Sequence, residues 1–327
     1  MSARWLARRL LTLVPTLLGI TLVTFFLSRL APGSPLGESL GVEDGKGLTR
    51  EQLATTERLL GLDRPWLVQY GDWIGRSLRF DFGDSLMADH RPVREKIGEA
   101  LAVSASLQSI AVMLMYAIGL PLGLFGAAWS GRRGERWLDQ ALFLLGALPL
   151  LFLGALLIAL CCTGEHAWFP LAGLMTPQLS GATGWIWFRD RCHHAVLPIA
   201  CLVLSGFPGI ARYARAGVAE ALAQPFVTAL RARGLSERRI LWRHALRNGL
   251  VPTVTLFANV FPWIVGGSVA VETLFSIPGL GRLATQSILA RDYPVVMALS
   301  VLVGAATLVG FLVSDLALMA IRRRSAA

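Results

Sequence analysis

The side chains that could carry out chemistry are scattered, and their spacings match no catalytic motif. The sequence contains no nucleophile elbow, no H-E-x-x-H helix and no Walker A loop. The one group with metal-ligand character is Cys192, His193 and His194, with Glu165 and His166 nearby in the sequence. We interpret these residues as polar loop positions and free thiols, with a metal site on the outer face as the alternative. We therefore expect no metal, no cofactor and no enzymatic activity in this chain.

A stretch of basic residues is the most concentrated chemical feature. Residues 231–248 hold six arginines and one glutamate, in a chain that is 54% hydrophobic and 16% charged. The pattern predicts a short helix, a break at Gly234, and a second, amphipathic helix that Ser236 caps and that lies along a membrane surface. Arginines can pair with anionic headgroups, but headgroup binding alone does not account for the first helix and its glycine break. We expect this elbow to be a docking site for another protein.

The chain that positions this stretch is predicted to cross a membrane repeatedly. Six runs carry no Asp, Glu, Lys or Arg. At about 1.5 Å per residue, each is long enough for a helix to cross a hydrocarbon core of about 30 Å. Lipid offers no partners to backbone N–H and C=O groups, so the spans must be helical. The predicted fold class is all-α, a polytopic membrane protein with six transmembrane helices. The six runs are 10–28, 100–131, 140–164, 192–211, 248–271 and 293–314.

Basic residues set the predicted orientation. Arginines gather before the first run, between the second and third runs, in region 212–248 and after the last run, which favours a cytoplasmic location for these segments and for both termini. The net charge of +10 is thus explained by membrane topology, and we expect no nucleic-acid partner. Arginines precede an apolar run at the N-terminus, as in a signal peptide. No small-x-small cleavage site follows, so we expect this run to be retained as the first span.

The long hydrophilic segment 31–99 is expected outside the membrane and mostly helical. Thr49 and Gln52 form a capping-box pattern that starts one short helix, and Pro65 suits the first turn of a second helix. The second helix carries an apolar stripe between Trp66 and Leu78, which needs a surface to pack on. The predicted organisation is a first helix over 1–30, a periplasmic segment over 31–99, a five-helix core over 100–321 with a cytoplasmic loop over 213–248, and a tail over 322–327.

A further charge-free run, 166–188, contains two prolines and three tryptophans. We interpret it as an interfacial loop whose Trp168, Trp185 and Trp187 lie at headgroup level. A seventh span or a re-entrant segment is the alternative.

Neutral polar residues interrupt two of the predicted spans. Such groups prefer protein or water to lipid, so they can line a solute pathway or hydrogen-bond between helices, and both interpretations are open for each residue. The lack of charged residues in the spans argues against a proton relay or an ion-coupled pump. The candidate pathway-lining residues are Ser104 and Gln108 in the second span, and Thr255, Asn259 and Ser268 in the fifth.

Residues 228–252, TALRARGLSERRILWRHALRNGLVP, resemble the cytoplasmic loop of ABC importer permeases of the dipeptide, oligopeptide and nickel transport family. Residues 8–35, 61–86 and 272–296 are similar to the first span, the outer segment and the last outer loop of the same family, so the resemblance covers nearly the whole chain. Three details depart from the family pattern. Leu230 replaces a common basic residue, Ser34 replaces the aspartate of a P-G-D-P motif, and the final AIRRRSAA lacks a tyrosine and a D-P-R ending.

The resemblance implies a type I ABC importer permease fold in a bacterial inner membrane, surrounded by lipid, and transport of peptides or peptide-like solutes. It also implies three kinds of partner: a second homologous permease, two ABC ATPases that bind ATP and magnesium, and a periplasmic or lipoprotein solute-binding protein. The alternatives are a nickel or metal-chelate importer and a non-transport membrane scaffold. The short helix before Gly234 would be the coupling helix held by one ATPase. The residues at the matching positions are Phe226, Thr228, Ala229, Arg231, Ala232, Arg233, Gly234 and Leu235.

Overall fold

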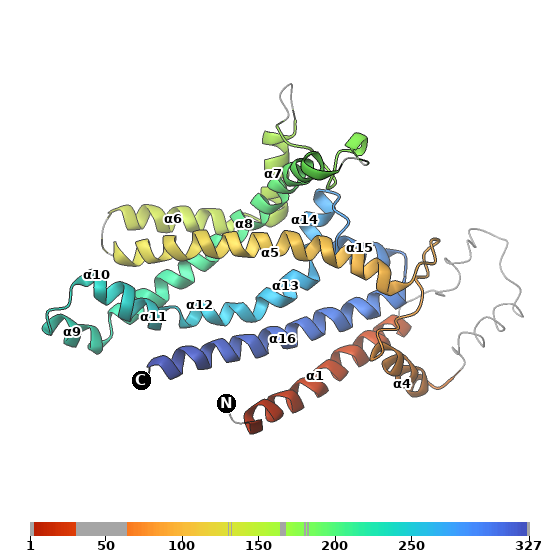
Figure 1. Cartoon of the computed structure of the whole chain (residues 1–327), viewed down its shortest axis with the longest axis horizontal. Helices are drawn as coiled ribbons and strands as arrows, with labels where there is room; N and C mark the ends of the chain where they lie inside the picture. The colour runs from red at the N-terminus through yellow and green to blue at the C-terminus, as the bar shows by residue number, and fades with distance from the viewer. Residues whose placement is uncertain are drawn as a thin grey trace, which may run out of the picture.

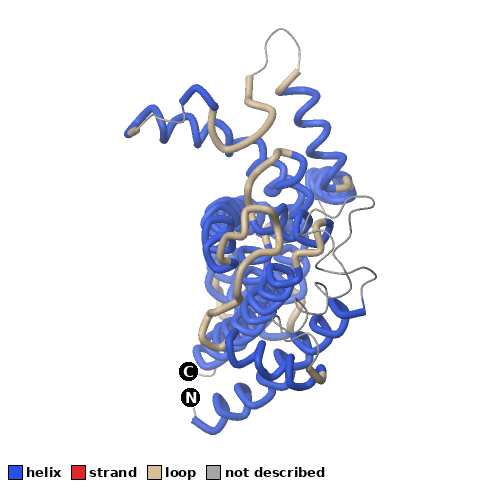
Figure 2. The backbone as a smooth tube through the Cα atoms, turned by 90° about the vertical axis from the view of Figure 1, so that its right-hand side faces the viewer, coloured by secondary structure: helices blue, strands red, loops and turns tan. Residues whose placement is uncertain are grey.

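The computed structural model describes residues 3–30, 64–129, 131, 133–163, 168–179, 181 and 183–325, and the regular secondary structure in these ranges is helical. Five helices or helix series are long and apolar enough to cross a membrane, and a sixth span results if two helices joined at a bend are counted as one. The predicted all-α membrane fold is confirmed. Figure 2 shows the helices as a bundle from which an arm of helix and loop projects.

Four long helices form the frame of the bundle. They are α1 (Ala3–Leu30), α5 (Val93–Ala128), α8 (Gly184–Leu222) and α16 (Tyr293–Ser325). α5 and α8 lie against each other along much of their length (Figure 1). Apolar side chains from both helices, joined by side chains just after α14, form the main core. Its members include Leu107, Ala111, Met115, Leu197, Cys201, Ile210, Phe275 and Ile277.

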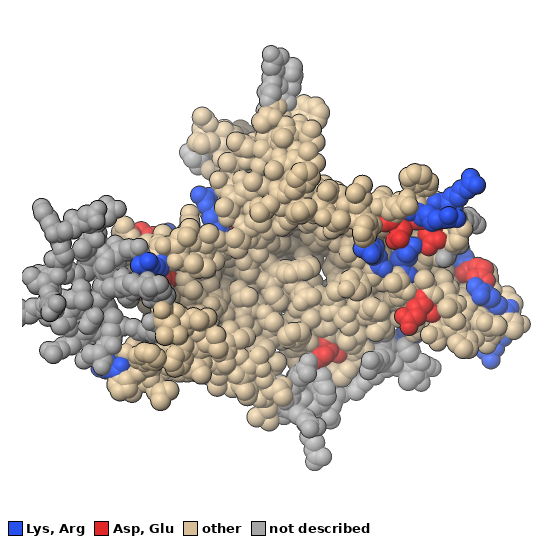
Figure 3. Space-filling view, turned by 180° about the vertical axis from the view of Figure 1, so that it is seen from behind, with Lys and Arg blue, Asp and Glu red and all other residues tan. Residues whose placement is uncertain are grey.

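Large apolar side chains also cover the outside of the bundle. Leu11, Leu144 and Leu160 are each about 70% exposed. A monomeric soluble protein rarely exposes contiguous apolar surface on this scale, whereas a membrane protein presents it to lipid or to partner helices. Figure 3 shows that most Lys, Arg, Asp and Glu side chains lie toward the two ends of the bundle and leave the middle largely uncharged.

The third predicted span, 140–164, is not one straight helix. α6 (Arg133–Ala147) and α7 (Leu150–Cys161) are bent by 95° relative to each other. Pro149 lies at the break with φ −60°, and a proline ring disfavours the α conformation of the residue before it, here Leu148. The expectation of a continuous helix was therefore wrong at this point, because hydropathy does not register a backbone break.

The fifth predicted span, 248–271, is part of a longer and irregular helix series. Pro252 and Pro262 have no N–H to donate within the series, which favours departures from regular α-helix. A break at Gly267 separates the last member from the rest. In order, the series contains α10 (Glu237–Arg239), the π-helical η2 (Ile240–Ala245), α11 (Leu246–Gly249), α12 (Val251–Thr255), the 3-10 helix η3 (Leu256–Asn259), α13 (Val260–Gly266) and α14 (Val269–Leu274).

The amphipathic helix predicted after Ser236 therefore continues into the fifth span and is not a separate surface helix. Ser236 does occupy the N-cap position of α10, but its side chain makes no capping hydrogen bond. Its backbone carbonyl instead accepts the Ile240 N–H at 3.0 Å. The prediction that the Ser236 side chain caps this helix was wrong.

The amphipathic helix predicted after Pro65 is confirmed as α4 (Trp66–Ser77). Its apolar stripe packs on the first span. The hydroxyl of Tyr70 donates to the Leu18 carbonyl at 3.1 Å and lies 2.8 Å from the Thr21 hydroxyl, and its ring packs edge-on against Phe25. The capping-box helix predicted at residues 49–52 lies outside the described residues.

Run 166–188 is mostly loop in its described part. It contains the 3-10 helix η1 (Pro177–Leu179), and its last residues form the first turn of α8. Within residues 168–179, 181 and 183 there is no helix of spanning length. Trp168, Trp185 and Trp187 are all exposed, and the latter two belong to α8.

Candidate functional site

The basic stretch folds into an elbow around Gly234. α9 (Pro225–Ala232) begins with proline at a position where a helix needs no N–H. Its end closes in a Schellman motif, in which the Leu235 N–H donates to the Leu230 carbonyl at 3.2 Å and the Gly234 N–H to the Arg231 carbonyl at 2.9 Å. Gly234 has φ +77°, which residues with a Cβ rarely adopt. The predicted glycine break is confirmed, and it sets a fixed turn between two helices.

Burial on α9 is confined to one side of the helix. Val227 is 0% exposed, as is Ile240 of η2, the segment next to α9. Sequence reasoning missed Val227 as the anchor of the elbow, because its burial depends on packing against another segment and no local pattern reveals it. Of the predicted coupling residues, Phe226 and Leu235 are half-buried, and the exposed ones are Thr228, Ala229, Arg231, Ala232, Arg233 and Gly234.

A bidentate ion pair bridges the elbow. Nε and a terminal nitrogen of Arg231 donate to the two carboxylate oxygens of Glu237 at 2.6 and 3.1 Å. The Glu237 carboxylate raises the pKa of Arg231 above its ordinary value. Arg231 is thus already paired with Glu237 of its own chain. Arg233 has no acidic partner in the described part of the chain. The pair opposes any widening of the turn at Gly234.

The base of the elbow is fastened where α8 crosses α11. A Cβ atom added to Gly217 would lie 2.1 Å from the carbonyl oxygen of Gly249, and one added to Gly249 would lie 2.5 Å from the Cα atom of Val218. Buried Val218, Ala221 and Ala245 close the crossing. The two helices that carry the elbow therefore meet backbone to backbone.

The α5–α6 turn is tied to the same end of α8. Arg215 donates to Glu135 at 2.8 Å and lies 3.4 Å from Asp139. Arg215 was predicted as a topology-setting charge; in the structure it also joins two spans.

A buried carboxylate organises the opposite end of the bundle. Glu272 is 2% exposed and accepts hydrogen bonds from the Ser104 hydroxyl at 2.7 Å, the Arg282 N–H at 3.0 Å and the Ser268 N–H at 3.2 Å. The Leu280 N–H donates to Ser104 at 2.7 Å. Glu272 and Ser104 together satisfy orphan N–H groups in the first turn of α15 (Leu280–Leu289), where a negative charge is also favoured by the helix dipole. Sequence reasoning missed this role, because Glu272 follows a charge-free run and was assigned to the outer loop.

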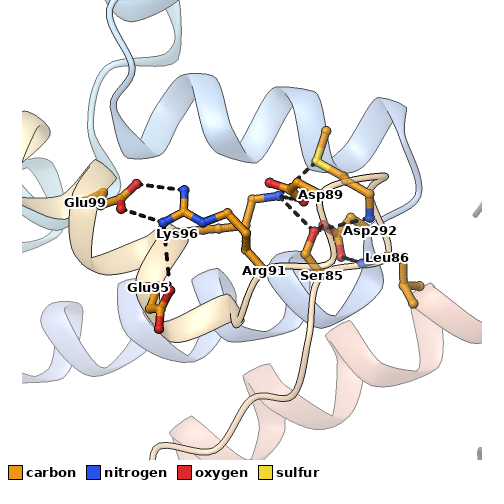
Figure 4. Close-up of polar contacts among 9 residues, drawn as sticks. Ser85, Leu86, Asp89, Arg91, Glu95, Lys96, Glu99 and Asp292 are labelled. Carbon is orange, nitrogen blue, oxygen red and sulfur yellow. Dashed lines mark hydrogen bonds and ion pairs between the residues drawn. The ribbon is translucent and has the colours of Figure 1, made fainter.

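A second polar cluster lies at the same end (Figure 4). Asp292 is 0% exposed and accepts the Ser85 hydroxyl at 2.5 Å and the Leu86 N–H at 3.1 Å. Lys96 donates to Ser85 and to Asp89, each at 2.9 Å, and the bond from Lys96 lowers the pKa of Asp89. The cluster fixes the turn before α5 to the start of α16.

The candidate pathway residues lie in two different environments. Ser104 and Gln108 are buried in the protein, and both hydrogen-bonding functions of Ser104 are used. Thr255 and Asn259 are exposed one turn apart on the fifth span. Ser268 is half-buried and accepts the Val271 N–H at 3.4 Å, which caps α14.

The Cys/His group ties loop 168–179 to α8. His193 lies 2.8 Å from the Trp168 carbonyl oxygen, and His194 bridges the Gly173 carbonyl and the Thr176 hydroxyl, each at 3.2 Å. Among the residues that the structure describes, no three His, Cys, Asp or Glu side chains gather as metal ligands. Glu165 and His166, named in the metal alternative, lie outside these residues.

In the part of the chain that the structure describes, a helical bundle with five or six apolar spans and an exposed elbow at one end defines a multi-pass membrane protein. The fold is similar to a subunit of the MetNI methionine ABC transporter, with a TM-score of 0.50 at 17% sequence identity, over 69% of this chain and 95% of the other. Residues 119–326 match the family of binding-protein-dependent transport system inner membrane components, and residues 2–86 match its N-terminal region. The chain belongs to this family and is the permease subunit of an ABC importer, not an enzyme.

Relatives match along nearly the whole chain. The oligopeptide transport system permease protein AppB of Bacillus subtilis is 34% identical over 96% of both chains. A putative peptide transport system permease protein of Brucella melitensis is 33% identical over 93% of this chain and 92% of its own. The peptidoglycan transport system permease protein YejB of Agrobacterium fabrum is 30% identical over 95% of both. As an inner-membrane component of such a system, this chain works with ATPase and solute-binding subunits, and the alternative of a non-transport membrane scaffold is not favoured.

Proposed function

We propose that this permease imports peptides or peptide-like solutes and that α9 is its contact with an ATPase. The names of the relatives support the peptide substrate. The lack of a gathered metal-ligand set in the described ranges gives no support to nickel as the solute. Thr255 and Asn259, exposed and neutral on the fifth span, are the pathway candidates that suit a solute with many amide groups.

The coupling proposal is supported by the rigid attachment of the exposed elbow to α8 and α11. The tip of α9 is exposed, its turn is fixed by the Schellman motif and the Arg231–Glu237 pair, and its base is fastened at Gly217 and Gly249. A partner that grips this tip moves α8 and α11 with it, because no flexible linker intervenes. Such rigid-body transmission is how an ATPase cycle would reach the spans.

The proposed orientation places the elbow in the cytoplasm. In Figure 1 the N-terminal end of α1 and the C-terminal end of α16 point toward the same end of the bundle as α9, and α4 and α15 lie toward the other. The arginines at the elbow end favour the cytoplasmic side for it and for both termini. Residues 31–99 then belong to the periplasmic face, and 213–248 to the cytoplasmic loop.

The proposed assembly pairs this chain with a second homologous permease, two ATPases and a periplasmic or lipoprotein solute-binding protein. ATP and magnesium bind to the ATPases, so this chain holds no cofactor. The supporting observation is that the described residues contain one such elbow, so one permease would offer one ATPase contact and two permeases would serve two ATPases.

Two substitutions at Gly234 test the coupling contact. A Cβ there meets no atom within 4 Å, so Asp and Asn both fit, and both tolerate the left-handed conformation better than other residues. They have nearly the same shape and differ in charge. We expect Gly234→Asp to abolish peptide uptake and ATPase co-purification, and Gly234→Asn to retain most of both. Uptake at the wild-type rate by Gly234→Asp would refute the coupling role.

Uptake of labelled peptides by a strain that lacks this gene tests the substrate. We expect uptake to fall in the deletion strain and to return with the wild-type gene. Unchanged peptide uptake together with a nickel-dependent growth defect would favour the metal alternative.

A further inference from the structure

An open concavity is formed by residues of the elbow that follow Gly234 in the chain. Its volume is about 410 Å³, and it is lined by Ser236, Arg238, Arg239, Trp242 and Arg243. This volume falls in the range of small-ligand sites, which is about 300–1,000 Å³. None of these residues belongs to the predicted coupling set.

The lining is strongly positive and contains no acidic residue. Glu237 is the one carboxylate within this stretch, and both its oxygens are held by Arg231. Arg238, Arg239 and Arg243 are exposed, and none of them has an acidic partner in the described part of the chain. Three guanidinium groups around an open concavity favour an anion with several oxygens, because a guanidinium can form paired hydrogen bonds to a phosphate.

The π-helical turn fixes which side faces outward. Ile240 and Ala245 are both 0% exposed and lie five residues apart, which is the hydrogen-bond spacing of a π-helix. Both side chains are thereby buried against the protein. Trp242 and Arg243 are left on the open side, where Trp242 is 51% exposed.

The concavity lies next to a candidate membrane span. Its helix series runs directly into the fifth span, whose charge-free run starts at Asn248. Arg243 precedes that run by five residues, which is about 8 Å at about 1.5 Å per residue. Arg239 and Arg238 precede it by nine and ten residues, which is about 14–15 Å, so they lie on the aqueous side of Arg243. The headgroup layer of one leaflet is about 5–8 Å thick. Trp242 has the amphipathic character of residues that lie in this layer.

We propose that this concavity binds the phosphate headgroup of an acidic phospholipid in the leaflet next to the elbow. The position of Arg243 near the span, the exposed Trp242 and the continuity with a span favour a lipid over the ATPase, whose proposed contact is the tip of α9. The bound headgroup neutralises the arginines and anchors the second arm of the elbow to the membrane surface. This site rests on the membrane location of the chain and is independent of the peptide substrate and of ATPase docking.

The test measures lipid binding to the full-length chain purified in detergent with its partner subunits. The probes are fluorescent-tailed phosphatidylglycerol and phosphatidylcholine at fixed salt. We expect the wild type to prefer phosphatidylglycerol, and the variant Arg238→Gln/Arg239→Gln/Arg243→Gln to bind it at least about tenfold more weakly, given about fivefold per arginine near a membrane surface. The matched control removes three other arginines at the same end, as Arg133→Gln/Arg136→Gln/Arg212→Gln, and should weaken binding no more than about threefold.

Four results would overturn the proposal. The first is equal loss in both triple variants, which indicates general surface charge. The second is displacement of the lipid by millimolar inorganic phosphate, which indicates a free-phosphate site. The third is loss of ATPase co-purification with unchanged lipid binding, which assigns the surface to the ATPase. If the first triple variant does not fold, Arg243→Gln alone is used. Wild-type lipid affinity in that variant is the fourth overturning result.

Discussion

The hydroxyl of Ser104 lies 2.7 Å from a carboxylate oxygen of Glu272, although 168 residues separate them in the chain. This bond joins α5 to the α14 end of the fifth span and, through the N–H groups of Leu280 and Arg282, to α15. A buried carboxylate supported only by hydroxyl and backbone N–H donors is stabilised by those bonds and by the positive end of the helix dipole. Removal of either partner therefore has consequences beyond one hydrogen bond.

Glu272→Ala leaves the Ser104 hydroxyl and the two N–H groups of Ser268 and Arg282 without their buried acceptor. We expect a loss of about 3 kcal/mol of stability, since each unsatisfied buried group costs about 1–3 kcal/mol. Ser104→Ala should cost less, about 1–2 kcal/mol. Unfolding by dodecyl sulfate titration measures both, and the double variant should be less destabilised than the sum of the two single variants. Strict additivity would show that the two residues act independently.

Gly217→Ala places a methyl group 2.1 Å from the backbone carbonyl oxygen of Gly249, and neither backbone can yield without moving a helix. We expect a loss of about 2–3 kcal/mol together with a loss of transport. Gly209 on the same helix is the matched control, because a Cβ there meets nothing within 4 Å. Gly209→Ala should be neutral or stabilising by up to about 1 kcal/mol. Equal effects of the two substitutions would mean that the crossing is not closely packed.

Glu237→Gln removes one half of the ion pair with Arg231 and keeps the side-chain shape. Both groups are exposed, so we expect no measurable change in stability. We expect the transport rate to fall by about twofold, because the variant loses one weak restraint on the turn of the elbow. Added salt should lower wild-type transport toward the variant and affect the variant less, because salt screens the pair. If salt changed transport by wild type and variant equally, the Arg231–Glu237 pair would not be what holds the turn at Gly234.

Asp89 gives the turn before α5 a dependence on pH. Lys96 lowers the folded-state pKa of Asp89 below its ordinary value of 3.8, so the interaction is fully present above that pH and is lost as the pH falls through the folded pKa. Asp89→Asn should make the turn before α5 more accessible to protease at neutral pH. The difference from wild type should shrink as the pH is lowered below 3.8. A difference that persists unchanged in acid would show that the carboxylate charge is not its cause.

Sequence patterns predicted much of the fold and part of the candidate site. Charge-free runs located the spans, because lipid excludes charge over a fixed length, and Gly234 marked the elbow, because only glycine adopts its conformation easily. Hydropathy could not detect the bend at Pro149, where a dihedral restriction overrides an uninterrupted apolar run. The burial of Val227 and Glu272 depends on segments distant in the chain, so no local pattern reveals it.

The crossing of α8 and α11 at Gly217 and Gly249 has one mechanical consequence. The two helices touch backbone to backbone with no side chains between them, so side-chain rearrangement cannot absorb a small displacement of one helix. We therefore expect the two helices to move together about this contact. A modest tilt imposed on α9 would then swing the far ends of two long arms at once. The displacement at the far ends would then grow in proportion to both the tilt and the length of each helix.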